Sequence, residues 1–179
     1  TNLRNAYRGI SGDTTGSISM VDGVWRNFSV SGIEAGVSHP KIQDISVTNA
    51  SAVNPSREYP AFSIYSDQLD LGQISGNSGE QGFQLSGTVT ASSSWSSQPS
   101  PWVISGSYPL TIANGAAVTL QPGAVLKGTV GPYGSPCCEG PVPVLGVSGA
   151  LNANGTEANP VTFTSIEDDS VGGDSNNDG

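Results

Sequence analysis

The apolar residues of this chain recur in short bursts, and within a burst they alternate with polar residues, as in 42–47 and 69–74. A spacing of two is that of a β-strand, whose alternate side chains face the same side. No stretch of a dozen residues keeps the three-four spacing of an amphipathic helix, and each of the 24 glycines would cost about 1 kcal/mol in a helix interior. The pattern therefore predicts short strands joined by turns.

The bursts also repeat along the chain. A small residue followed by a large apolar one recurs with a period of roughly 20 to 29 residues, which is typical of a solenoid, in which each repeat forms one coil that stacks on the next. We therefore predict an all-β fold, a right-handed parallel β-helix (β-solenoid). The alternative is an antiparallel β-sandwich, which is also built from short strands and Gly/Pro turns. The repeated pairs are Gly9-Ile10, Gly32-Ile33, Ala61-Phe62 and Gly82-Phe83.

Composition narrows the class of protein. Only 35% of the residues are hydrophobic, which raises disorder as an alternative, but their clustering into bursts argues against it for all but the last dozen residues. The net charge of −9, with six basic residues, disfavours nucleic acids and anionic membrane surfaces as partners. No apolar run approaches the roughly 20 residues that span a bilayer, and we recognise no signal peptide. We expect a mature or trimmed piece of a longer extracellular protein.

The residue pattern of the sequence changes after Ser86. The stretch 110–128 contains Leu-Thr-Ile followed by Gly-Ala-Ala-Val-Thr-Leu-Gln-Pro-Gly. The stretch 145–165 ends in Gly-Thr-Glu-Ala-Asn-Pro-Val-Thr-Phe-Thr-Ser, and 168–179 is an acidic loop rich in Gly, Asp and Asn. These motifs resemble the first rungs of large bacterial secreted and cell-surface β-helix proteins of the pectate-lyase-like superfamily. The resemblance implies an adhesin-like scaffold at the cell surface or in the extracellular space.

The same change in residue pattern suggests a division of the chain into segments. We expect β-helix body rungs over 1–86, a junction or cap over 87–109 and further β-helix rungs over 110–166. A Cys-Cys loop at 131–141 interrupts the last of these, and an acidic loop follows at 167–179.

The acidic loop is the clearest candidate for ligand binding. It holds five of the fifteen carboxylates and no cation. Asp174, Asn176 and Asp178, followed by a glycine, match the opening of a calcium loop, in which alternate residues turn their oxygens toward a hard cation, and Asp169 lies close by in sequence. The carboxylate that would complete this motif about six residues later is missing. The loop therefore predicts either an incomplete calcium site or a solvated, solubilising insertion.

Cys137 and Cys138 are adjacent in the sequence. A disulfide between neighbours closes a strained ring. The pair can form such a vicinal bond, remain as thiols or bridge to other chains.

Catalysis is not predicted. Glycoside hydrolysis needs two carboxylates at a set separation across a sugar cleft. The only adjacent carboxylates here lie at 167–169, and neighbours in a strand point to opposite faces. The single histidine, His39, precedes Pro40 in a predicted turn, and no Gly-x-Ser-x-Gly motif occurs. The runner-up function is a carbohydrate-binding or carbohydrate-active β-helix.

For that runner-up, the candidate sugar contacts are Trp25, Trp95 and Trp102. The alternative for the last two is that they fill the junction, because they flank its Ser/Pro turn.

Assembly is the remaining prediction. The terminal coils of a solenoid expose strand edges that can pair with another chain. We therefore expect an extracellular structural module that self-associates, into a filament for example, or forms part of a longer tandem surface protein. A polysaccharide is a further candidate partner.

Overall fold

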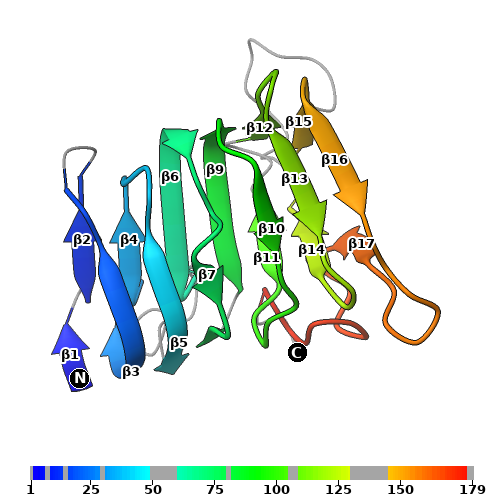
Figure 1. Ribbon diagram of the computed structural model, residues 1–179. Coiled ribbons are helices and arrows are strands. Elements are labelled where there is room, and N and C mark those ends of the chain that lie inside the picture. Colours follow the sequence, from blue (N-terminus) through cyan, green and yellow to red (C-terminus); the bar gives the residue numbers. More distant parts are fainter. Residues whose placement is uncertain are drawn as a thin grey trace, which may run out of the picture.

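The computed structural model describes residues 2–6 (as backbone), 9–13, 16–28, 31–48, 60–79, 82–104, 109–129 and 145–176. Within these ranges the chain forms strands and no helix (Figure 1). Each strand pair is parallel. The strands are β1 (Asn2–Ala6), β2 (Ile10–Gly12), β3 (Ser19–Phe28), β4 (Ile33–Ala35), β5 (Lys41–Thr48), β6 (Phe62–Leu69), β7 (Ile74–Ser75), β8 (Ser78–Gly79), β9 (Phe83–Val89), β10 (Ser93–Trp95), β11 (Trp102–Ile104), β12 (Leu110–Ile112), β13 (Ala117–Leu120), β14 (Val125–Gly128), β15 (Leu145–Val147), β16 (Ala150–Ala153) and β17 (Thr162–Ser165).

The strands build three sheets. One has the order β1-β3-β5-β7, with β8 also on β5; a second has the order β10-β13-β16. The third and largest runs β17-β14-β11-β9-β6-β4-β2, with β12 on β9 and β15 on β12. Figure 1 shows the strands advancing from β1 and β2 at one end to β16 and β17 at the other. Successive partner residues in the large sheet lie 19 to 37 residues apart in sequence, and we call the segment from one partner to the next a coil.

One column of inward-facing residues runs the length of the large sheet. Neighbouring members are direct partners in the parallel ladder, and the predicted anchors Ile10, Ile33, Phe62 and Phe83 are its first four. The spacing of the sequence repeat is therefore the coil length, which confirms the stacking register we predicted. The full column is Ile10, Ile33, Phe62, Phe83, Trp102, Leu126 and Phe163.

Aromatic rings fill the middle of this column. Phe62 and Phe83 stack with ring centroids 4.7 Å apart and 13° between their planes. Trp102 continues the stack at 5.4 Å from Phe83, and Trp95, from a different sheet, contacts Trp102 at 5.2 Å. All four side chains are fully buried. Aromatic pairs stabilise a core beyond the contribution of the apolar surface that they bury. We therefore expect this aromatic layer to contribute strongly to the stability of the fold.

An asparagine bridges the break in the ladder between β5 and the strands β7 and β8. Asp44 has a φ of +54°, and β5 pairs with β7 before that point and with β8 after it. In the gap, the fully buried Asn77 accepts a hydrogen bond from the Ile45 amide at 3.2 Å and donates one to the Ile42 carbonyl at 2.9 Å. Its side chain thus replaces the backbone partners that the interruption of the ladder removes.

These observations confirm an all-β fold with parallel sheets, and the parallel pairing argues against the antiparallel sandwich. Strand β9 crosses the expected boundary at residue 86 and pairs with β6 on one side and with β11 and β12 on the other. The division of the chain into four segments stays a prediction. In the part of the chain that the structure describes, no helix is long and apolar enough to cross a membrane.

Candidate functional sites

The first candidate site is an apolar cavity at the β1–β3 end of the stack. It measures about 260 Å³. It opens there because β1 pairs only with the second half of β3, from Val24 onward, and no other described strand lies beside the first half on that side. Asp22, with a backbone φ of +54°, kinks β3 beside the opening. The cavity is lined by Ile10, Ser19, Met20, Val21, Gly23, Trp25 and Ile45.

The opposite end of the stack presents apolar side chains outward. Phe163, the last member of the inward column, is 52% exposed, and Val147, which pairs with Ile112, is 48% exposed. Leu145 and Leu151 of the same coil are only partly buried. Each of these residues has a buried partner in the preceding coil, so their exposure means that no described coil covers them.

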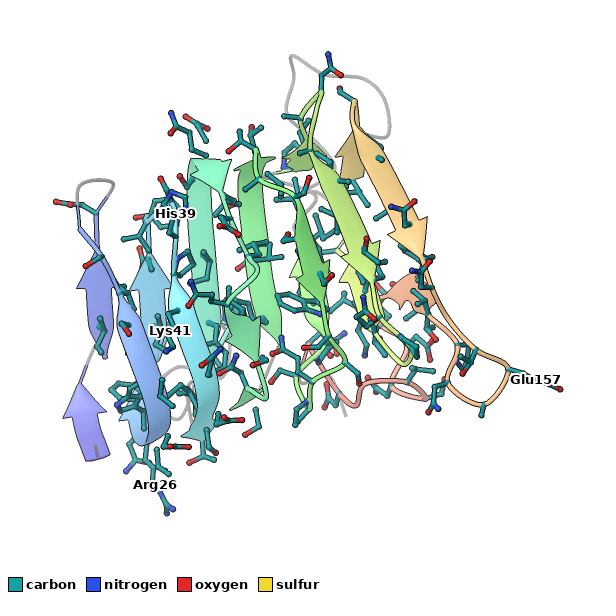
Figure 2. All side chains as sticks on the ribbon, in the orientation of Figure 1. Arg26, His39, Lys41 and Glu157 are labelled. Atoms are coloured by element: carbon teal, nitrogen blue, oxygen red, sulfur yellow. The ribbon has the colours of Figure 1, made fainter. Side chains whose placement is uncertain are left out.

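Charge is distributed unevenly along the sequence. The sequence from 1 to 57 contains five of the six cations and carries a formal charge of +1, whereas the sequence from 129 to 179 contains seven carboxylates, no cation and a charge of −7. In Figure 2, Arg26 and Lys41 lie toward the β1–β5 end and Glu157 projects at the far end.

The acidic segment closes over a buried lysine. Lys127 of β14 is fully buried, and its Nζ donates hydrogen bonds to the carbonyl oxygens of Asp168, at 2.8 Å, and Gly173, at 2.6 Å. Gly172 and Gly173 adopt φ values of +72° and +74°, which glycine tolerates best. A Cβ on Gly172 would lie 3.2 Å from Pro101 and 3.4 Å from the Lys127 side chain. The segment thus packs directly on the lysine that it encloses.

Electrostatics within this segment follow from burial and hydrogen bonds. Burial lowers the pKa of Lys127, and the carboxylates of Asp169, Asp168 and Asp174 oppose that shift. Hydrogen bonds from Ser170 and Thr164 lower the pKa of Asp168. Asp168 is therefore ionised at neutral pH and adds negative charge around the ammonium group.

The position of Lys127 bears on whether the acidic loop can bind calcium. Of the four candidate ligands, Asp169 and Asp174 are exposed, Asn176 is buried, and Asp178 lies outside the described residues. Among the residues that are described, no three His, Cys, Asp or Glu side chains gather as a metal site would require. The cation that the structure places inside this segment is the lysine ammonium. Calcium binding stays a prediction.

Sequence reasoning missed Lys127 because its partners lie 41 and 46 residues farther along the chain. One signal was present: Lys127 is the only cation after Arg57 in the sequence, and it sits in an apolar strand next to a segment rich in carboxylates.

The three candidate sugar contacts all lie in the interior. Trp95 and Trp102 have no exposed surface and Trp25 is 2% exposed, so none offers a ring face to a sugar in this fold. The Nε1 groups of Trp95 and Trp102 donate to Ser93 and to the Ser96 carbonyl. The alternative, in which Trp95 and Trp102 fill the interior, agrees with the geometry. The aromatic stack in which they lie explains why residues of this size are needed there.

Two further candidates add little. His39 lies in the expected bend, 72% exposed, with its Nδ1 3.5 Å from Asp70 Oδ2. Cys137 and Cys138 lie outside the described residues.

Comparisons with protein families, with curated proteins and with solved structures found no match.

Proposed function

We propose that this chain is a structural module of an extracellular or cell-surface protein, a right-handed parallel β-helix that acts as a stiff rod and catalyses no reaction. The observation that carries the proposal is the inward column from Ile10 to Phe163. A column that continues through every coil resists bending, because each rung is bonded to the next through backbone hydrogen bonds and buried side chains.

The surface composition fits an extracellular setting. Only 12% of the residues are charged, so most surface polarity comes from Ser, Thr, Asn and Gln. The exposed apolar residues of the last coil support a module that is extended by further coils, because a solenoid coil normally needs a neighbour or a polar cap to cover its inner face. Those coils belong either to another copy or to a longer chain.

Small-angle scattering and polysaccharide assays test this proposal together. We expect a rigid, elongated particle whose axial dimension grows by about 4.8 Å per coil, and neither cleavage nor saturable binding of neutral or acidic polysaccharides. Turnover of a polysaccharide would overturn the structural role in favour of a carbohydrate-active β-helix. A flexible or compact particle would overturn the rod.

A further inference from the structure

We propose that the ammonium group of Lys127 is the resident cation of the acidic segment 166–176 and takes the place of a metal ion there. The segment contains four carboxylates and no cation of its own. With the lysine as its counterion it keeps its fold at any calcium concentration, in contrast to the calcium loop that the sequence predicts. The inference goes beyond the proposed structural role and does not depend on it.

The first argument is the position of Lys127 on the large sheet. Leu126 belongs to the inward column, so the side chain of its neighbour Lys127 leaves the outer face of the sheet. A lysine is almost never fully buried unless it is paired, yet this one is. The chain turns back from β17 toward β11 (Figure 1), and a Cβ on Gly172 would lie 3.4 Å from Cε of Lys127. The segment is therefore packed directly over the lysine.

The second argument is the set of oxygen atoms around the ammonium group. Calcium loops bind their cation through backbone carbonyl and carboxylate oxygens, and Lys127 Nζ meets the same two classes here. It donates to the carbonyl oxygens of Asp168, at 2.8 Å, and Gly173, at 2.6 Å. The carboxylates of Asp169, Asp168 and Asp174 stabilise its positive charge. A divalent metal ion bound to the same carbonyls would be repelled by the ammonium charge.

The third argument is that the segment is shaped to present these two carbonyl groups to the lysine. The Asp168 carboxylate accepts hydrogen bonds from Thr164 Oγ1, at 2.6 Å, and from the Ser170 amide, at 3.1 Å, which fixes that residue on β17. Gly172 and Gly173 both adopt positive φ values, which suit glycine, and form the turn that brings the Gly173 carbonyl to the ammonium. Both carbonyl groups are thus held in place by the segment itself.

Limited proteolysis with chemical rescue tests the proposal. A serine protease specific for glutamate needs no metal ion and cuts after Glu167 when the segment opens. The same protease cuts after Glu157, in the exposed turn at 154–160 (Figure 2), which gives an internal reference within the same molecule. Mass spectrometry of the fragments measures the rate of each cut.

Lys127→Ala removes the ammonium and leaves a space that n-propylammonium matches, because its carbons and nitrogen correspond to Cγ, Cδ, Cε and Nζ of the lysine. We expect the cut after Glu167 to become at least about tenfold faster, with the cut after Glu157 unchanged. Added propylammonium should return the rate to within about threefold of the wild type, because a ligand that binds the closed segment stabilises it. Propanol has the same carbon chain without the charge and should not protect the segment.

Further measurements serve as controls. Lys41→Ala removes a lysine from β5 and should leave the segment as well protected as in the wild type. In the wild type, neither calcium nor a chelator should change the rate of the cut after Glu167 by more than about twofold. Thermal melts establish that each variant is folded. Lys127→Met, which keeps an apolar chain of similar length, replaces Lys127→Ala if the smaller side chain prevents folding, and it should release the segment without rescue by propylammonium.

Several results would overturn the inference. Protection of the wild-type segment by calcium, or its release by a chelator, would mean that a metal ion holds it. An unchanged rate in Lys127→Ala or Lys127→Met would show that the lysine does not. Equal rescue of Lys127→Ala by propanol and propylammonium, or rescue by neither, would show that the ammonium charge is not what the segment requires. None of these results bears on the rod-like structural role, because scattering and polysaccharide assays test it separately.

Discussion

Removal of the Asn77 side chain should destabilise the fold far more than its small size suggests. Asn77→Ala deletes the acceptor of the Ile45 amide and the donor to the Ile42 carbonyl, both in buried bonds. A buried polar backbone group left without a partner costs about 1–3 kcal/mol. With two such groups and some relaxation or entry of water, we expect a loss of about 3 kcal/mol.

Urea denaturation followed by circular dichroism measures this loss. For a slope of about 1–3 kcal/mol per molar urea, the midpoint should fall by about 1–3 M. Gln98→Ala is the matched control, because the Gln98 side chain accepts from both Asn77 nitrogens but leaves the two bonds to β5 in place. Its cost should stay below about 1 kcal/mol.

Asn77→Asp separates the two backbone bonds. The carboxylate keeps an acceptor for the Ile45 amide but, while ionised, cannot donate to Ile42, and it also buries a charge. It should therefore cost more than Gln98→Ala at neutral pH and recover in part under acidic conditions. If Asn77→Ala and Gln98→Ala cost the same, the bridging role of Asn77 in the ladder would be refuted.

Four other outcomes follow from the same structure. Phe83→Ala opens a cavity in the aromatic stack and should cost about 3–5 kcal/mol in urea denaturation, whereas a loss below about 1 kcal/mol would contradict the packing. Lys127→Met removes the ammonium that holds 166–176, so limited proteolysis should cut that segment at least about tenfold faster, and an unchanged rate would show that the lysine does not hold it. Because folding lowers the pKa of Asp168 below 3.8, the stabilisation is complete above that pH and is lost as the pH falls through the folded value. Melting at stepwise lower pH should show this loss in the wild type and not in Asp168→Asn. If the acidic loop binds calcium, a chelator should lower the melting temperature; no shift would refute the predicted site.

The stacking of the coils was accessible from the sequence because it depends on local spacing. Apolar residues two positions apart define which side chains face inward, and the recurrence of Gly32-Ile33 and Gly82-Phe83 marks where each coil returns to the same place. Neither the alternation within a strand nor the recurring small-apolar pair depends on the length of the loops between strands. The ladder partners Ile33, Phe62 and Phe83 therefore follow from the sequence alone.

The enclosure of Lys127 and the role of Asn77 were not accessible in the same way. Each depends on a polar group from one coil meeting backbone atoms of a distant one, 35, 41 or 46 residues away. No local sequence pattern indicates contacts between residues so far apart. The burial of Trp25 was not predicted either. Because apolar Val24 precedes it, alternation alone does not decide which of the two side chains faces inward.

The unequal lengths of the coils make this chain a scaffold for grafting foreign peptides. The coil that leads from Phe83 to Trp102 is only about half as long in sequence as the one from Leu126 to Phe163, yet all four residues remain in one ladder. The described part of the extra length includes the exposed turn at 154–160, and closing a longer loop adds little entropy cost. This turn is a suitable insertion point, because a peptide grafted there would be exposed while the ladder partners on either side stay in place.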